Sequence, residues 1–163
     1  MKPGGALPWL WLSGVIIALD QLTKWIAVDS LERFESIPVF PGLNWTLLYN
    51  FGAAFSFLNV PGGAQRWLFT GLAVVISAVL LVWLSRTPRS DWRTAVPLAL
   101  IVGGALGNVI DRIRLGYVID FIDVYYRQWH WPAFNIADSA ITVAAVFLVV
   151  WGFRNAPENQ QSD

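Results

Sequence analysis

Long apolar tracts alternate with shorter polar segments along the chain. Four tracts reach the length of about twenty mostly apolar residues that crosses a bilayer as a helix. We expect them at about residues 8–28, 66–84, 94–110 and 133–153, within a single domain that covers residues 1–163. The first tract contains Asp20 and Lys24 and lacks a cleavage site of small residues, so we interpret it as a retained span.

The two longer connecting segments, at about residues 29–65 and 111–132, have a different pattern. In the first, apolar residues alternate with polar ones around Pro38, Pro41 and Gly42, which is typical of short strands. Its later part, "YNFGAAFSFLNVPGG", has the glycines and aromatic residues expected of a lid over a bound ligand. We expect the polar tail, about residues 155–163, to be disordered.

This pattern predicts an all-α membrane protein with four transmembrane helices, a small extracytoplasmic β-element and a short lid-like helix or loop. The composition agrees, because 56% of the residues are hydrophobic and only 13% are charged. The short segment between the second and third tracts contains Arg86, Arg89 and Arg93. Short basic loops stay in the cytoplasm, so we expect both termini there and the two longer segments outside.

Charge and composition exclude several classes of function. A formal net charge of zero argues against a nucleic-acid partner, because no basic surface exists to neutralise phosphates. The chain has no cysteine, which excludes thiol nucleophiles and thiolate metal sites. A zincin site is excluded because His130 is the only histidine, and Ser139 lacks the G-x-S-x-G context of a serine hydrolase. We expect no metal and no cofactor.

Polar side chains in the outer halves of the apolar tracts are the candidates for function. A charged group at the bilayer centre costs roughly 2.5 to 3.5 kcal/mol, so each one requires a partner or a role. All of these side chains map to the outer side of the expected topology. They are Asp20, Lys24, Asn50, Asn108, Asp111, Arg112, Asp120, Asn135 and Asp138.

Some of these residues have simple structural explanations. Asp20 and Lys24 are four residues apart with the acid first, which is the favourable order for an ion pair within a helix. The glycines of "GGALGN" allow two helices to approach closely, just before Asp111 and Arg112. The Arg112 guanidinium, with five donors at the lipid boundary, is equally suited to hold a substrate carbonyl or carboxylate.

Asp120 and Asp138 are the candidates for chemistry. If the third and fourth tracts are antiparallel neighbours, the two carboxyls lie at similar depth. Two carboxyls in a medium of low dielectric share one proton, as in aspartyl proteases, where one activates water and the other polarises the carbonyl. Asp123 is a rival to Asp120, and spacing does not choose between them. Asp138 would otherwise cap a helix, and His130, between two tryptophans, is interpreted as an interfacial residue.

Two other classes of function fit the same residues. A small proton-coupled transporter would also place intramembrane aspartates within a helix bundle, although the chain has no inverted repeat. A non-catalytic membrane assembly factor would use the acidic residues for contacts with partners.

Five motifs in order resemble the lipoprotein signal peptidase family, also called signal peptidase II, the bacterial intramembrane aspartyl proteases. They are "DQLTK", "YNFGAAFSF", "GGALGNVIDR", "VIDFIDV" and "PAFNIADSAI", and the resemblance extends from Pro8 to Phe153. The resemblance implies that Asp120, and not Asp123, is the partner of Asp138. It implies that Asn50, Asn108, Arg112 and Asn135 bind the substrate, and that Asp20, Lys24 and Asp111 are structural supports.

The resemblance also implies a substrate and a location. The expected reaction is hydrolysis of the bond before a diacylglyceryl-modified cysteine, which removes the signal peptide from a prolipoprotein. No cofactor is implied, and the cyclic peptide globomycin is an expected inhibitor. We expect a multi-pass protein of the bacterial cytoplasmic (inner) membrane that contacts lipid, is a monomer and has its active site near the outer face.

Overall fold

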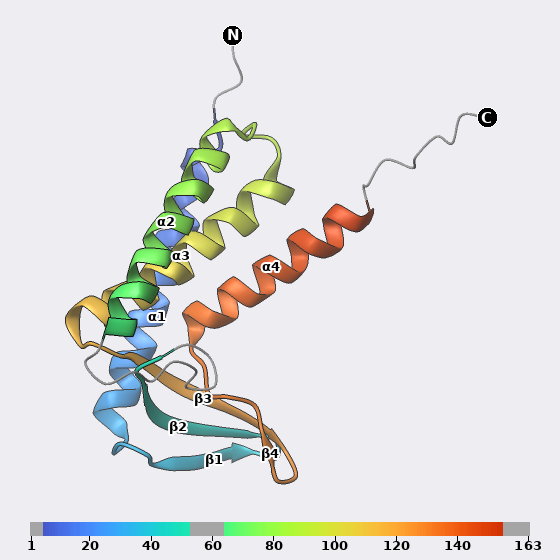
Figure 1. Ribbon diagram of the computed structural model, residues 1–163. Helices are drawn as coiled ribbons and strands as arrows, with labels where there is room; N and C mark the ends of the chain where they lie inside the picture. Colours follow the sequence, from blue (N-terminus) through green and yellow to red (C-terminus); the bar gives the residue numbers. More distant parts are fainter. Residues whose placement is uncertain (1–4, 53–63, 155–163) are drawn as a thin grey trace.

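The computed structural model describes residues 5–52 and 64–154, which form a helical bundle with a small sheet at one end (Figure 1). Four helices are long and apolar enough to cross a membrane: Leu7–Ser30, Ala64–Arg86, Trp92–Arg114 and Ile136–Phe153. The predicted fold class is therefore confirmed. In chain order the elements are η1 (Leu7–Leu10), α1 (Trp11–Ser30), β1 (Ser36–Phe40), β2 (Leu43–Asn50), α2 (Ala64–Arg86), α3 (Trp92–Arg114), β3 (Val118–Tyr126), β4 (Trp129–His130) and α4 (Ile136–Arg154).

Two element bounds differ from the sequence expectation in a way that affects the site. The predicted third span stops at residue 110, whereas α3 continues to Arg114, so Asp111 and Arg112 lie in its last turn. The predicted fourth span begins at residue 133, whereas α4 begins at Ile136, because residues 133–135 run alongside β3 with Phe134 bridged to Ile122. Most of the predicted lid and all of the predicted tail lie outside the described residues.

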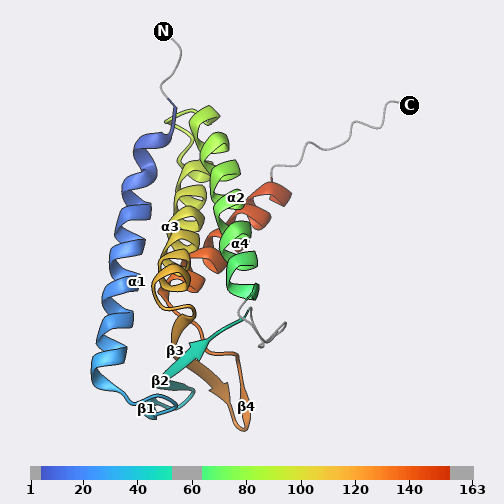
Figure 2. The same cartoon turned by 60° about the vertical axis from the view of Figure 1, so that its left-hand side comes forward.

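Helix α3 is the central helix of the bundle, with contacts to α1, α2 and α4 (Figure 2). Its glycines permit this arrangement, as the sequence predicts. A Cβ atom on Gly103 would lie 2.8 Å from Ser13 Cα of α1, and one on Gly104 would overlap the Ala137 carbonyl oxygen of α4. Close backbone approach is how helices in membranes gain packing energy.

The sheet is antiparallel, with the strand order β1-β2-β3-β4. One of its faces packs on the end of α1 in an apolar cluster that contains Leu31, Leu47, Ile119 and Phe121. Side chains alternate along a strand, so the neighbours of Leu47 on β2 face the other way. Asn50 lies on that second face, as does Asp120, which pairs with Leu48.

The two ends of the bundle are formed by different elements. The sheet lies at the end where α1 finishes and α4 starts, and the turn between α2 and α3 lies at the opposite end (Figure 1). At that turn the Asp91 side chain accepts a hydrogen bond from Thr94 N (3.2 Å) and caps α3. The described parts of both long connecting segments thus lie at the sheet end of the bundle.

Candidate active site

The Asp120 and Asp138 side chains come from different elements and lie near each other at the junction of sheet and bundle. Asp120 lies on β3 and is 2% exposed. Asp138 lies in the first turn of α4. Asn135, directly before α4, is fully buried, and its Oδ1 accepts a hydrogen bond from Asp138 N (2.9 Å), so this residue caps the helix that carries Asp138.

Three asparagine carboxamides bind the two carboxyl groups. Asn50 Nδ2 donates to Asp120 Oδ2 (2.9 Å), and Asn135 Nδ2 donates to Asp120 Oδ1 (2.7 Å). Asn108 Nδ2 donates to Asp138 Oδ1 (2.7 Å), and its own Oδ1 accepts from Asn135 Nδ2 (3.3 Å). The two carboxyl groups are therefore connected through Asn135 and Asn108.

The orientation of each carboxamide is fixed by a group that can only donate. Asn50 Oδ1 accepts from Gly52 N (3.0 Å), and Asn135 Oδ1 accepts from a backbone N–H of α4. Asn108 Oδ1 accepts from Lys24 Nζ (3.0 Å), an ammonium group with no acceptor. The NH₂ end of every one of these asparagines must then face a carboxyl group, so the donor pattern of the site is determined without any substrate.

A buried ion cluster lies behind these amides. Lys24 Nζ is 2.7 Å from Asp20 Oδ2 and 2.8 Å from Asp111 Oδ2, and all three side chains are at most 3% exposed. Asp20 Oδ1 also accepts from Ala137 N of α4 (2.9 Å), and Asp111 Oδ2 accepts from Ile119 N of β3 (3.2 Å). The cluster thus connects α1 and α3 to the two elements that carry Asp120 and Asp138.

A cavity of about 550 Å³ opens beside this network, between the start of α4 and the sheet. Its walls include Asn50, Asn108, Arg112, Trp131, Phe134 and Asp138. The Arg112 guanidinium lies 5.7 Å from the centre of the Phe69 ring, which is a cation–π contact. The cavity has the size, the apolar walls and the few convergent polar groups of a ligand site.

The position of Asp120 perturbs its acidity. Burial, followed by the nearby negative charge of Asp138, raises the pKa of Asp120 to about 7, although hydrogen bonds from Asn50 and Asn135 oppose the shift. A carboxyl group whose pKa lies near neutrality is able both to take and to give a proton at physiological pH.

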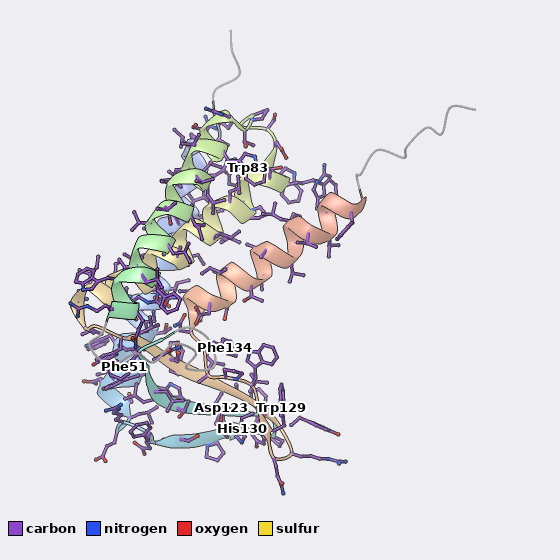
Figure 3. All side chains as sticks on the ribbon, viewed as in Figure 1. Phe51, Trp83, Asp123, Trp129, His130 and Phe134 are labelled. Carbon is purple, nitrogen blue, oxygen red and sulfur yellow. The ribbon has the colours of Figure 1, made fainter. Side chains whose placement is uncertain are left out.

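Asp123, the rival of Asp120 in the sequence, lies outside this network. It accepts from Asn44 Nδ2 (2.8 Å) and pairs with His130 Nδ1 (2.9 Å) toward the far end of the sheet (Figure 3). The side chain of His130 is 51% exposed and stacks on Tyr125. The structure therefore brings Asp120, and not Asp123, to the residues around Asp138.

Sequence reasoning missed two residues of the wider site. Gln21 Nε2 donates to Asp111 Oδ1 (2.9 Å) and to Gly107 O (3.3 Å), so it ties α1 to α3 beside the ion cluster. The signal was available, since Gln21 is the second residue of "DQLTK" and lies within an apolar tract. Asn44, the hydrogen-bond partner of Asp123, gave no comparable signal, because an asparagine near a turn is common.

Within residues 5–52 and 64–154, no group of three His, Asp or Glu side chains could hold a metal ion.

Comparison with known proteins gives consistent results. A family model described as signal peptidase (SPase) II matches residues 12–154. The lipoprotein signal peptidase of Acinetobacter baylyi is 55% identical over 144 residues, which cover 88% of this chain and 80% of that protein. The lipoprotein signal peptidase of Acinetobacter baumannii is 54% identical over 159 residues, which cover 96% of this chain and 90% of that protein. A solved bacterial membrane enzyme superimposes with a TM-score of 0.85 at 26% identity, covering 100% of this chain and 99% of that one.

Proposed function

The chain belongs to the signal peptidase II family, and from this premise we propose that Asp120 and Asp138 are its catalytic pair. As a member of that family, the protein is a protease of the bacterial inner membrane that removes signal peptides from prolipoproteins. A proton-coupled transporter finds no support among these relatives. The observation that carries the proposal is that carboxyls from β3 and α4 are joined through Asn135 and Asn108 beside a cavity.

The pair acts as an acid and a base that exchange roles. With one proton between them, the ionised carboxyl takes a proton from a water molecule while the water oxygen attacks the peptide carbonyl. The protonated carboxyl donates to the carbonyl oxygen, which gives a neutral tetrahedral diol. The proton taken from water then passes to the nitrogen of the leaving amine as the C–N bond breaks, while one diol hydroxyl gives its proton to the other carboxylate, so the pair again holds one proton. The titration belongs to the pair, and the raised pKa of Asp120 is in keeping with it.

The asparagines and Arg112 divide into two roles in this proposal. Asn50, Asn108 and Arg112 line the cavity, where their donors bind the carbonyl groups of the substrate backbone. Asn135 is fully buried, so it serves the substrate indirectly by holding Asp120 and the first turn of α4. Asp20, Lys24 and Asp111 support this arrangement from behind.

The finer substrate and topology follow from the same proposal. The bond hydrolysed is the one before a diacylglyceryl-modified cysteine, whose lipid chains stay in the outer leaflet beside the cavity. Both termini lie in the cytoplasm, the active site lies near the outer face, and the protein acts as a monomer in contact with membrane lipid. Globomycin would inhibit it by occupying the cavity beside Asp138.

A cleavage assay in liposomes tests the catalytic pair. Lipid-modified and unmodified prolipoprotein are incubated with wild type, Asp120→Asn, Asp138→Asn and the control Asp29→Asn, whose side chain is exposed on α1. Removal of an acid–base group is expected to lower turnover of the modified substrate at least about 100-fold, and the control leaves it unchanged. Retained turnover in either variant removes that residue from the chemistry.

A further inference from the structure

A second cavity, of about 500 Å³, lies next to the active-site cavity. The two share Trp131, Pro132 and Ala133 as a common wall. Residues of α3 and α4 help to line the first cavity, whereas every residue that lines the second belongs to the sheet or to the segment that follows it. A path from the first cavity into the second therefore leads away from the membrane helices.

Strand β2 runs along both cavities. Thr46 and Leu48 line the second cavity and Asn50 lines the first, so this strand passes from one cavity to the other. Asn44, two residues before Thr46, donates to Asp123, just as Asn50 donates to Asp120. The β2–β3 pairing thus contains two Asn–Asp pairs, Asn50–Asp120 and Asn44–Asp123, and only the first of them belongs to the catalytic network.

In the second Asn–Asp pair, the Asp123 carboxylate is also bonded to a histidine, His130. His130 Nδ1 lies 2.9 Å and 3.0 Å from the two carboxylate oxygens of Asp123, which places the ring proton on Nδ1. His130 lines the cavity, and in its neutral ring the other nitrogen, Nε2, is an acceptor. Together with the Asp123 carboxylate it would accept hydrogen bonds from N–H and hydroxyl groups of a ligand. Leu48, Trp129 and Trp131 supply apolar walls.

The known reaction determines what reaches this position. A signal peptide is an apolar segment that occupies the membrane beside the helices, while the chain after the cut must continue into water. We propose that the cavity at Asp123 and His130 binds the first residues of the mature lipoprotein, directly after the cysteine at the cut. The ligand class is an extended peptide with small side chains that donate hydrogen bonds. This inference rests on the proposed placement of the cut at Asp120 and Asp138.

The test uses two synthetic prolipopeptides in liposomes with the full-length enzyme. Both contain a diacylglyceryl-cysteine, one ending directly after it as an amide and the other extended by Ser-Ser-Gly-Ala. Wild type is expected to cleave the extended peptide with a kcat/KM about tenfold higher, which corresponds to one or two hydrogen bonds. In His130→Ala and in Asp123→Asn this preference falls to about twofold or less. His130 is half exposed, so its replacement leaves the fold intact.

The control is Tyr126→Phe, which removes one hydroxyl from an exposed ring outside both cavities and is expected to keep the tenfold preference. Three results overturn the inference: equal cleavage of both peptides by wild type, an equal loss on both peptides in His130→Ala, or a loss that appears only with anionic lipid, which would identify a headgroup contact. Failure of the catalytic proposal appears separately, as turnover retained in Asp138→Asn.

Discussion

The catalytic role proposed for Asp120 comes with a cost in stability. Its carboxyl is buried, and its pKa is raised from 3.8 to about 7. Between these pH values the folded protein binds more protons than the unfolded chain, so the free energy of unfolding falls as pH rises. The full shift corresponds to at most ~4 kcal/mol, a net value in which the opposing hydrogen bonds from Asn50 and Asn135 are already included.

We therefore predict that Asp120→Asn is more stable than wild type at pH 8 and inactive at every pH. At pH 4 the folded wild-type carboxyl is protonated and the unfolded one has only partly ionised, so the two proteins differ much less. Thermal unfolding in detergent between pH 4 and pH 8 measures the difference. If the melting temperatures of the two proteins changed with pH in the same way, the prediction would be contradicted.

Lys24 is the residue on which the orientation of Asn108 depends. In Lys24→Met the carboxylates of Asp20 and Asp111 stay buried without a cation, which is expected to destabilise the protein by about 3 to 5 kcal/mol. Adding Asp111→Asn removes one of these charges, so unfolding measurements should show a partial return of stability. Cleavage should not return, because Asn108 Oδ1 keeps only the longer hydrogen bond from Asn135 Nδ2 (3.3 Å) and the carboxamide is less firmly held. Activity that recovers in step with stability would show a merely structural role.

At the scale of single residues, the sequence indicates which residues are unusual but not which of them are in contact. Polar residues in apolar tracts, such as Asp20 and Asn108, are visible by their cost in lipid. The choice between Asp120 and Asp123 was not available from spacing, because it depends on hydrogen bonds to Asn50 and Asn44, which lie 70 and 79 positions away in the chain.

Among the elements, α3 and α4 set the position of Asp138 through one close contact. A methyl group on Gly104 would overlap the Ala137 carbonyl oxygen and lie 2.8 Å from Ile141 Cγ1. We predict that Gly104→Ala displaces the first turn of α4 and lowers kcat about 100-fold, the cost of a displacement near 1 Å. The matched control is Gly71→Ala on α2, where no atom lies within 4 Å of the added methyl. Equal activity of the two variants would refute the assignment.

Element types were easier to predict than element ends. The four helices follow from the lengths of their apolar tracts. The late start of α4 does not, because Phe134 first pairs with β3 and Asn135 then caps the helix. Similarly, α3 keeps Asp111 and Arg112 within its last turn because the Asp111 carboxylate is paired with Lys24. In each case a tertiary contact overrides the local apolar pattern.

For the molecule as a whole, the two ends of the bundle predict its orientation. Arg86, Arg89 and Arg93 lie at the end opposite the sheet, which should face the cytoplasm. The chain has no cysteine, so single cysteines report without background. In intact spheroplasts we predict that a membrane-impermeant maleimide labels Gln128→Cys but not Ser90→Cys. Lysis should expose the second site, and labelling of Ser90→Cys before lysis would reverse the topology.

The three asparagines that hold the carboxyl groups are already aligned before any substrate arrives, since each is fixed by Lys24 or by a backbone N–H. Little rearrangement of these groups is then required when a prolipoprotein binds. Under dilute substrate the slow event becomes the encounter of two proteins moving through a viscous sheet of lipid. The rate of turnover should accordingly follow the fluidity of the bilayer. It should drop abruptly at the temperature at which the lipid chains enter the gel phase.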